Sequence, residues 1–314
     1  LGDVYKRQIQ NAAVGRNSLD ANTTGSYNTS MGVNAMTTST TGSNNTACGK
    51  SALGSNTTGN DNTAVGHYAS GANTTGISNV GVGVSALNTN TTGDNNTAVG
   101  FQALKASTTG SNNTAVGMYA LDANTTGYQN VAVGKEALSG CTTGHRNVAI
   151  GLDAMLLSNG TYNVAVGSYA ADALTTGGSN VAIGMHAMGA NSTESYNTAC
   201  GYEALGATTV AGQTAVGYGA MTQNTTGDGN VAVGYYAKRY GTGHDNCTAV
   251  GYEALQGVNG YNNSDNNTAI GYRALKAVNS GQSNTAVGAE SVVNNTAGRN
   301  KTAVGNYSLH QNTT

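Results

Sequence analysis

The sequence predicts an all-β fold, a parallel β-solenoid (β-roll) of about 18 coils of about 17 residues with two short strands per coil. Three observations support this prediction. One phrase repeats along the chain, as in residues 113–129 (NTAVGMYALDANTTGYQ), and starts again at Asn130. The composition, with 46 Gly and no Pro or Trp, offers few long side chains for a thick core. Length differences between copies fall in one part of the phrase, as expected of loops along one edge.

The positions of the phrase can be numbered as slots 1 to 17, with copies beginning at Asn11, Asn28, Asn45 and so on. Slot 1 is mostly Asn, slot 4 is mostly Val or Ile, and slot 9 is mostly Leu or Met. Slots 3 and 8 hold only small residues, and slot 5 is Gly in every copy, from Gly15 to Gly305. Slots 12 to 15 read Asn-Thr-Thr-Gly in the most regular copies.

The run Thr-Ala-Val before the slot 5 Gly predicts a short strand and a tight turn, in which Gly supplies a positive φ angle. A second strand would carry slots 8 and 9, and the Asn-Thr-Thr-Gly run would lead to the next coil. Helices are disfavoured because Gly, Asn and Thr have low helix propensity. Since side chains alternate along a strand, we expect slots 4 and 9 to form the aliphatic core. The small residues at slots 3 and 8 indicate close packing, either inside one coil or against a neighbouring subunit of a trimer.

We expect two regions in the chain. Residues 1–10 (LGDVYKRQIQ) do not fit the phrase and are interpreted as a non-repeat leader, either an assembly or expression artefact or the end of a preceding segment. Residues 11–314 are expected to form a single β-solenoid repeat domain. Its last copy begins at Lys301 and stops within the phrase, so we interpret the domain as truncated at its C-terminal end.

Composition and charge argue against several classes of function. The formal net charge of −2 and the scarcity of Lys and Arg argue against a nucleic-acid partner. The chain lacks the run of about twenty apolar residues that a transmembrane helix needs, so no membrane insertion is expected in this segment. An enzyme such as a solenoid polysaccharide lyase would need paired carboxylates or a Lys/Arg cluster on adjacent coils, and the sequence pattern has neither.

Residues that commonly form sites are scattered over the slots. Cys48 and Cys200 fill slot 4, where they would replace Val in the core, too far apart for a disulfide. The histidines occupy different slots and are expected on the surface: His67, His145, His186, His244 and His310. Acidic residues recur at slots 16 and 17 without the pattern of calcium-binding solenoids, although calcium in the return loops stays open: Asp61, Asp94 and Asp228. We therefore predict no catalytic residue, no cofactor and no metal site.

One column of side chains is more informative. Slot 6 is Tyr in five consecutive copies: Tyr202, Tyr218, Tyr235, Tyr252 and Tyr272. Stacked coils would bring them into an exposed aromatic ladder, which either stabilises the stack or docks a glycan or another surface partner. The Asn-x-Thr sequons, such as Asn22-Thr23-Thr24, are interpreted as ladder and turn residues, with N-glycosylation as the alternative in a secreted eukaryotic chain.

The segments Asn147-Val148-Ala149-Ile150-Gly151 and Asn180-Val181-Ala182-Ile183-Gly184 resemble the head repeat of trimeric autotransporter adhesins, in which Val or Ile flank Ala before a Gly. They are similar also to the repeat shafts of phage tail fibres. The resemblance covers residues 11–314 through one short motif per coil, and this repeat is longer than the adhesin unit. It implies a left-handed parallel β-roll, association of three chains, and a surface that mediates attachment.

The predicted function is therefore structural or adhesive: the shaft of an extracellular fibre on a bacterial cell surface or a virion, without enzymatic activity. The predicted partners are further copies of the chain, in a homotrimer, and a cell-surface glycan or host receptor. The alternative is an ice-binding β-solenoid with Thr and Asn ladders. Against it, the Asn-Thr-Thr run places its two Thr on opposite faces, so a regular Thr-x-Thr array is not expected.

Overall fold

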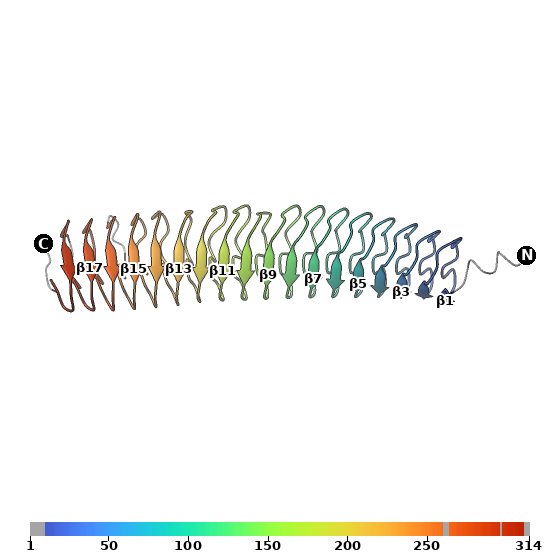
Figure 1. The fold of residues 1–314 in the computed structure, drawn as a ribbon, viewed down its shortest axis with the longest axis horizontal. Helices are drawn as coiled ribbons and strands as arrows, with labels where there is room; N and C mark the ends of the chain where they lie inside the picture. The colour runs from blue at the N-terminus through green and yellow to red at the C-terminus, as the bar shows by residue number, and fades with distance from the viewer. Residues whose placement is uncertain (1–9, 260–263, 296, 311–314) are drawn as a thin grey trace, which may run out of the picture. The chain divides into compact units, whose positions relative to one another are not determined.

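The computed structural model describes residues 10–259, 264–295 and 297–310. Within these residues the fold is all-β, with one strand of three residues in every coil and no helix. The chain divides into two compact units, residues 1–159 and residues 160–314, which we call the N-terminal and the C-terminal unit. Each unit is a parallel β-solenoid, so the predicted fold class is confirmed (Figure 1).

Neighbouring strands within each unit pair in parallel and in register. Thr97–Val99, for example, pairs residue by residue with Thr114–Val116, so equal slots form continuous columns. The strands of the N-terminal unit are β1 (Ala12–Val14), β2 (Thr29–Met31), β3 (Thr46–Cys48), β4 (Thr63–Val65), β5 (Val80–Val82), β6 (Thr97–Val99), β7 (Thr114–Val116), β8 (Val131–Val133) and β9 (Val148–Ile150). Those of the C-terminal unit are β10 (Val164–Val166), β11 (Val181–Ile183), β12 (Thr198–Cys200), β13 (Thr214–Val216), β14 (Val231–Val233), β15 (Thr248–Val250), β16 (Thr268–Ile270), β17 (Thr285–Val287) and β18 (Thr302–Val304).

Several expectations concern the ends and the insertion of the array. Apart from Gln10, the leader at residues 1–10 lies outside the described residues. Residues 260–263, within the longest coil, and residues 311–314 at the predicted truncation lie outside them as well. The organisation of residues 11–314 as one domain stays a prediction.

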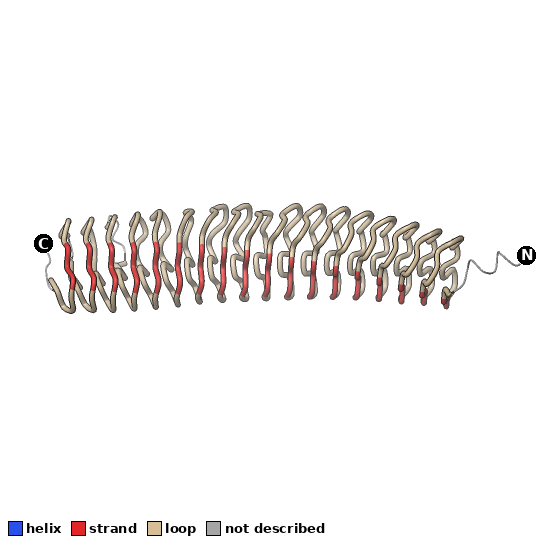
Figure 2. The backbone as a smooth tube through the Cα atoms, in the orientation of Figure 1, coloured by secondary structure: helices blue, strands red, loops and turns tan. Residues whose placement is uncertain are grey.

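The second strand predicted for each coil is wrong: slots 6 to 10 form successive turns, drawn in tan in Figure 2. Slots 7 and 9 adopt left-handed backbone angles, for example φ 57° at Tyr119 and φ 53° at Leu121. Such residues interrupt the extended backbone that a strand requires. The segment still bonds to the next coil, since the N–H of Leu104 donates to the carbonyl of Ala120 at 2.9 Å. The pattern of small and aliphatic residues predicted a buried segment, but it carried no signal for this backbone geometry.

The tight turn at slot 5 is confirmed. The φ angles of the slot 5 glycines run from 123° to 143°, a region that L side chains rarely adopt. A Cβ atom at Gly100 would also lie only 2.5 Å from the carbonyl oxygen of Gly117 in the next coil. Backbone conformation and coil spacing therefore both require Gly at this slot.

The core prediction is right for slot 9 and wrong for slot 4. Ala115 at slot 3, Ala120 at slot 8 and Leu121 at slot 9 are fully buried, whereas Val116 at slot 4 is 37% exposed. Slots 3 and 8 meet inside one coil, as the Ser30 hydroxyl donates to the carbonyl of Ala35 at 3.1 Å. The space between them holds only small side chains. Strand alternation then turns slots 2 and 4 outward.

A column of buried Asn side chains at slot 1 links the coils. The Nδ2 of Asn113 donates to the carbonyl of Gly127, across the same coil, at 2.9 Å. Its Oδ1 accepts the backbone N–H of Asn130, in the next coil, at 3.0 Å. Each such amide therefore satisfies two buried backbone groups that the short strands leave without a partner.

Candidate functional site: the outer sheet face and the aromatic ladder

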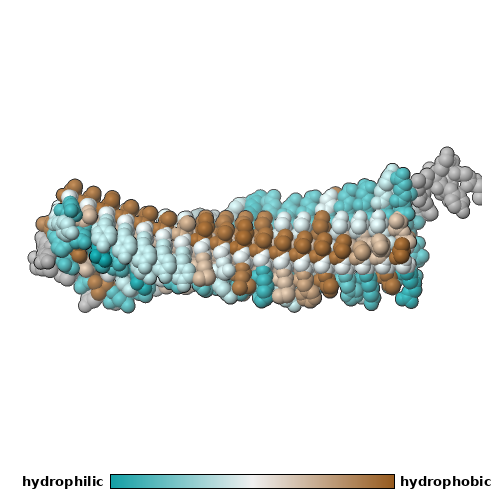
Figure 3. Space-filling view, turned by 90° about the horizontal axis from the view of Figure 1, so that it is seen from below, coloured by the Kyte–Doolittle hydropathy of each residue, from teal (hydrophilic) through white to brown (hydrophobic). Residues whose placement is uncertain are grey.

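Slots 2 and 4 point outward from every strand and form two columns on the outer face of each sheet. We call the second of these the slot 4 column, and none of its residues is buried. In the N-terminal unit it contains Val14, Met31, Cys48, Val65, Val82, Val99, Val116, Val133 and Ile150, and in the C-terminal unit Val166, Ile183, Cys200, Val216, Val233, Val250, Ile270, Val287 and Val304. Figure 3 shows apolar side chains in rows along this face. Slot 2 is Thr or Val after the first coil, so neither column carries a charge.

The five slot 6 tyrosines of the C-terminal unit form a stacked ladder. Ring centroids lie 5.1 Å apart for Tyr202 and Tyr218, 5.2 Å for Tyr218 and Tyr235, 5.1 Å for Tyr235 and Tyr252, and 5.4 Å for Tyr252 and Tyr272. The interplanar angles are only 5° to 17°. Because each ring covers the face of its neighbour, the ladder presents ring edges and hydroxyls to solvent. The stacking supports the stabilising role, and docking of a partner stays a prediction.

A sixth tyrosine, which the sequence analysis missed, joins this ladder from slot 7. The ring of Tyr236 packs edge-on against Tyr218 at 5.3 Å and lies 4.3 Å from the ring of Tyr235. Hydrogen bonds with Tyr236 raise the pKa values of both Tyr218 and Tyr235. Gly219 makes room, since a Cβ atom there would overlap the Tyr236 ring. The Arg239 guanidinium covers that ring at 4.0 Å. The sequence signal for this contact is a Gly at slot 7, Gly219, one coil before a Tyr at the same slot, Tyr236.

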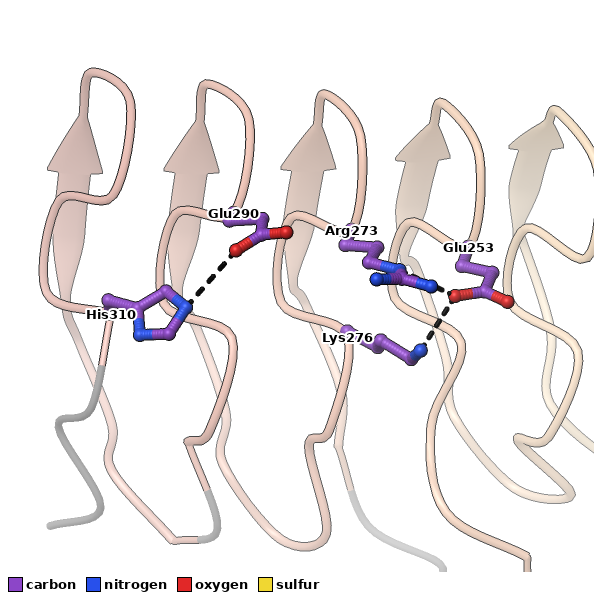
Figure 4. A network of polar contacts seen from close by, with 5 residues as sticks. All are labelled: Glu253, Arg273, Lys276, Glu290 and His310. Atoms are coloured by element: carbon purple, nitrogen blue, oxygen red, sulfur yellow. Dashed lines mark hydrogen bonds and ion pairs between the residues drawn. The ribbon is translucent and has the colours of Figure 1, made fainter.

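Acidic side chains at slot 7 meet basic side chains of the next coil (Figure 4). Glu253 Oε2 accepts hydrogen bonds from Arg273 Nε at 2.9 Å and from Lys276 Nζ at 2.6 Å. Partial burial alone would raise the pKa of the Glu253 carboxyl, but the hydrogen bonds and charges of Lys276 and Arg273 outweigh it and hold that pKa below its usual value. Glu290 and His310 form a similar pair at 3.3 Å.

One coil places a charged residue in its core. Lys238 fills slot 9 and is fully buried, and its Nζ donates to the carbonyl of His244 at 3.2 Å and to Asn224 Oδ1 at 3.3 Å. Desolvation lowers the pKa of Lys238 to about 8. Gly241 provides the space, because a Cβ atom there would lie 3.2 Å from Lys238 Nζ. The sequence signal for this arrangement is the joint change of slots 9, 12 and 15 in this coil. The complete burial of Lys238 indicates a structural role.

Two expectations for single residues are wrong. Cys48 is exposed and Cys200 half-buried, because slot 4 faces outward, while Cys141 and Cys247 are the buried thiols. All four cysteines are free, and burial raises the pKa of the Cys141 thiol to about 11. His244, expected on the surface, is 1% exposed because it replaces the slot 15 Gly beside Lys238.

The slot 12 sequons and the acidic slots serve the stacking of coils. Asp94 Oδ1 accepts the backbone N–H of Ile77 at 2.8 Å, and Asp61 Oδ1 accepts Nδ2 of Asn44 at 3.1 Å. Asn amides at slot 12 are buried and donate to the slot 15 carbonyl, which leaves no room for a glycan: Asn56, Asn73, Asn90, Asn124 and Asn224. This geometry favours the ladder interpretation at these positions.

Among the described residues, no group of three or more His, Cys, Asp or Glu side chains is placed to hold a metal ion. The same residues form no apolar helix of membrane-spanning length. Compared with known proteins, the chain matches no family model and no curated protein. The outer sheet face, the aromatic ladder and the slot 7 charges are candidate surfaces for a partner.

Proposed function

We propose that the chain is a non-enzymatic structural or adhesive part of an extracellular fibre, on a bacterial surface or a virion, and that it assembles as a homotrimer. The observation that carries the proposal is the exposed slot 4 column. Val99 and Val116 are 36% and 37% exposed on adjacent strands, and uncharged residues flank them at slot 2. Burying apolar surface stabilises an interface by about 25 cal/mol per Å². A contiguous apolar row on a sheet face favours such burial.

A second copy of the same chain is a well-matched partner for this face. Its columns repeat with the same strand spacing of about 4.8 Å, so side chains of two faces can interdigitate over many coils. The coil interior contains mostly Ala, Leu and Asn, and its apolar content is small. Association would add the apolar burial that a single chain lacks. The resemblance of the repeat to trimeric adhesin heads agrees with three chains.

Size-exclusion chromatography with light scattering tests the proposal. The unsubstituted chain should elute with three times the chain mass. Replacing Val99 and Val116 by Asp should release monomers, because each buried carboxylate would lack a partner. The matched control replaces Thr109 and Thr126, exposed slot 14 residues of the same two coils, by Asp and should remain trimeric. A monomeric mass for the unsubstituted chain would refute self-association.

Attachment to a cell-surface glycan or host receptor is the adhesive part of the proposal. The exposed hydroxyl edge of the aromatic ladder is the surface best suited to hydrogen-bond such a partner. Replacing Tyr218, Tyr235 and Tyr252 by Phe would keep the stacking and remove the hydroxyls. Adhesion to cultured cells should fall in this variant while its oligomeric mass stays unchanged.

Ice binding remains a second candidate because of one observation. Thr97 and Thr114 at slot 2 pair directly across adjacent strands and point outward, so the sheet face carries a Thr column separate from the Asn-Thr-Thr run. Val80 and Val131 interrupt that column, which weakens the match to a regular Thr array. A thermal-hysteresis assay separates the two functions, since activity of a monomeric chain at micromolar concentration would replace the fibre proposal.

A further inference from the structure

The C-terminal unit contains the same surface pair twice. Tyr202-Glu203 and Tyr252-Glu253 each follow a slot 5 Gly and each precede Ala-Leu. Both therefore place Tyr at slot 6 and Glu at slot 7, on the same side of the coil. The two copies differ in what the next coil places against them, so the unit contains its own comparison.

At Tyr252 and Glu253 the next coil supplies two cations (Figure 4). Arg273 and Lys276 both bond to the Glu253 carboxylate. The Arg273 guanidinium also lies 4.9 Å from the ring centroid of Tyr272 and 6.0 Å from that of Tyr252. With these neighbours the Glu253 side chain is only 12% exposed. This copy shows what the Tyr-Glu pair holds when a ligand is supplied: a guanidinium and an ammonium group.

At Tyr202 and Glu203 the corresponding cations are replaced by small residues. Gly219 stands at the slot of Arg273 and Thr222 at the slot of Lys276. The Tyr236 ring occupies the space beside Gly219, whereas Thr222 borders an open hollow of about 500 Å³ that Tyr202 and Glu203 also line.

Neighbouring coils widen this hollow. Gly189 and Gly206 line it from slot 10, where the filled copy has Arg239 and Gln256. Three consecutive slot 10 positions therefore lack a long side chain at the first copy. The absence of these side chains creates the space that a ligand would need.

Among the described residues, no Lys or Arg pairs with the carboxylate in this hollow, and the imidazole of His186 lines the same space. The one side-chain partner of the carboxylate there is the Tyr202 hydroxyl, whose hydrogen bond to Glu203 raises the pKa of Tyr202. A second hollow, at the same slots in the N-terminal unit, has Asn34 and Ser51 at slot 7. It therefore lacks a carboxylate and serves as a natural control.

We infer that the hollow at Tyr202 and Glu203 binds the basic side chains of a partner peptide, one Arg and one Lys that bond to the Glu203 carboxylate as Arg273 and Lys276 bond to that of Glu253. The guanidinium would bond to the Glu203 carboxylate beside the Tyr202 ring, which is stacked on Tyr218 and contacted by His186. This site is distinct from the slot 4 column and does not depend on self-association.

The test is a titration of the full chain with a blocked tetrapeptide, Arg-Ala-Leu-Lys, followed by NMR. We expect saturable binding at one site per chain. Glu203→Gln should weaken it at least about tenfold, since hydrogen bonds to charged groups are among the stronger polar contacts. Thr222→Lys should weaken it to a similar degree by supplying the cation from within the chain. A Gln-Ala-Leu-Gln peptide should not bind.

The reciprocal variant sharpens this test. Arg273→Gly and Lys276→Thr, combined with Arg239→Gly and Gln256→Gly, copy the open arrangement onto Tyr252 and Glu253, so the chain should then bind two peptides. Val233→Asp, in the slot 4 column, should change the oligomeric mass and leave peptide binding intact, which separates this inference from the proposed fibre.

Three outcomes would overturn the inference. They are absence of saturable binding, equal binding by the Glu203→Gln variant, and a stoichiometry of one in the reciprocal variant. A chitosan tetramer provides an amine from a different source. If it bound through Glu203 and the peptide did not, the partner would be an amino sugar and the assigned peptide would be wrong.

Discussion

Two coils fill the same three core slots with different side chains. In residues 79–95 the core slots 9, 12 and 15 hold Leu87, Asn90 and Gly93, and in residues 230–246 they hold Lys238, Gly241 and His244. In the regular coil, Lys at slot 9, Gly at slot 12 or His at slot 15 would each pack poorly as a single change. Their simultaneous appearance in one coil, with all three buried, shows that the core is specified by combinations of slots.

The shared requirement is a hydrogen-bond donor at one point in the core. In the regular coil, Asn90 Nδ2 donates to the slot 15 carbonyl of Gly93 and to Asn73 Oδ1 of the preceding coil, both at 2.9 Å. In the altered coil, Lys238 Nζ donates to the same two kinds of acceptor, the carbonyl of His244 and Asn224 Oδ1. A buried acceptor without a donor costs about 1–3 kcal/mol, which explains why the donor persists although its residue changes.

The largest expected effect concerns what the two coils have in common. Gly83 and Gly234 both occupy slot 5 with φ angles of 134° and 137°. Replacing Gly234 by Ala would strain this backbone and bring Cβ into the carbonyl oxygen of Gly251. We expect the C-terminal unit to lose about 4 kcal/mol or more, as for other backbone-incompatible substitutions. Urea unfolding followed by circular dichroism would measure the loss.

A matched control substitutes a Gly whose position is open. A Cβ atom at Gly212 would meet no atom within 4 Å, although its φ is 71°. Gly212→Asn should therefore be nearly neutral, since Asn tolerates left-handed angles. If Gly234→Ala were equally mild, the coil spacing would not depend on slot 5.

An intermediate effect is expected from restoring only part of the regular core. Gly241→Asn adds the usual slot 12 residue while Lys238 and His244 still fill its space, with His244 Nδ1 3.0 Å from the added Cβ. Overpacking of this kind costs about 1–3 kcal/mol. Combining it with Lys238→Leu and His244→Gly should recover the loss, because contacting residues are not additive. Hydrogen exchange of the amides in residues 230–246 would measure the loss of stability in the single variant and its recovery in the triple variant. Additive losses of stability would contradict a core shared by the three slots.

These coils also show what the sequence could and could not predict. The period placed every strand and every slot 5 Gly, because backbone demands repeat with the chain. The orientation of the strand was predicted incorrectly, since hydrophobicity alone put Val116 inside and Ala115 was judged only by size. The interior between slots 3 and 8 is thin and admits only small side chains, so the strand turns Ala115 inward and Val116 outward. This thickness results from closure of the coil and is not visible in the hydrophobic pattern.

The candidate sites were likewise only partly predictable from the sequence. The Tyr202 to Tyr272 column was predictable from the period, because a column needs only equal slots. The hollow at Glu203 was not, since it depends on small residues at slot 10 of three successive coils, Gly189, Gly206 and Thr222. Such contacts join slots 7 and 10 of different copies, and an alignment of equal slots does not show them.

The smallest expected effect is a pH dependence confined to the altered coil. Desolvation lowers the pKa of Lys238 from 10.5 to about 8. Between these values the unfolded chain binds more protons than the folded chain, so the free energy of unfolding should rise with pH. The slope from this group is at most about 1.4 kcal/mol per pH unit. Below about pH 8 both states carry the proton, and this contribution to the slope disappears.

Other groups titrate in the same range, so the measurement must be a difference. Burial raises the pKa of the Cys247 thiol, which makes the folded state lose stability as pH rises. The triple variant with Leu, Asn and Gly at slots 9, 12 and 15 keeps Cys247 and every Tyr while removing Lys238. In urea unfolding at several pH values, the free energy of unfolding of the natural chain should rise relative to that of this variant as pH rises above about 8. Parallel curves would mean that the core amine does not titrate differently in the folded and unfolded chains, and the altered coil would then differ from the regular one in shape alone.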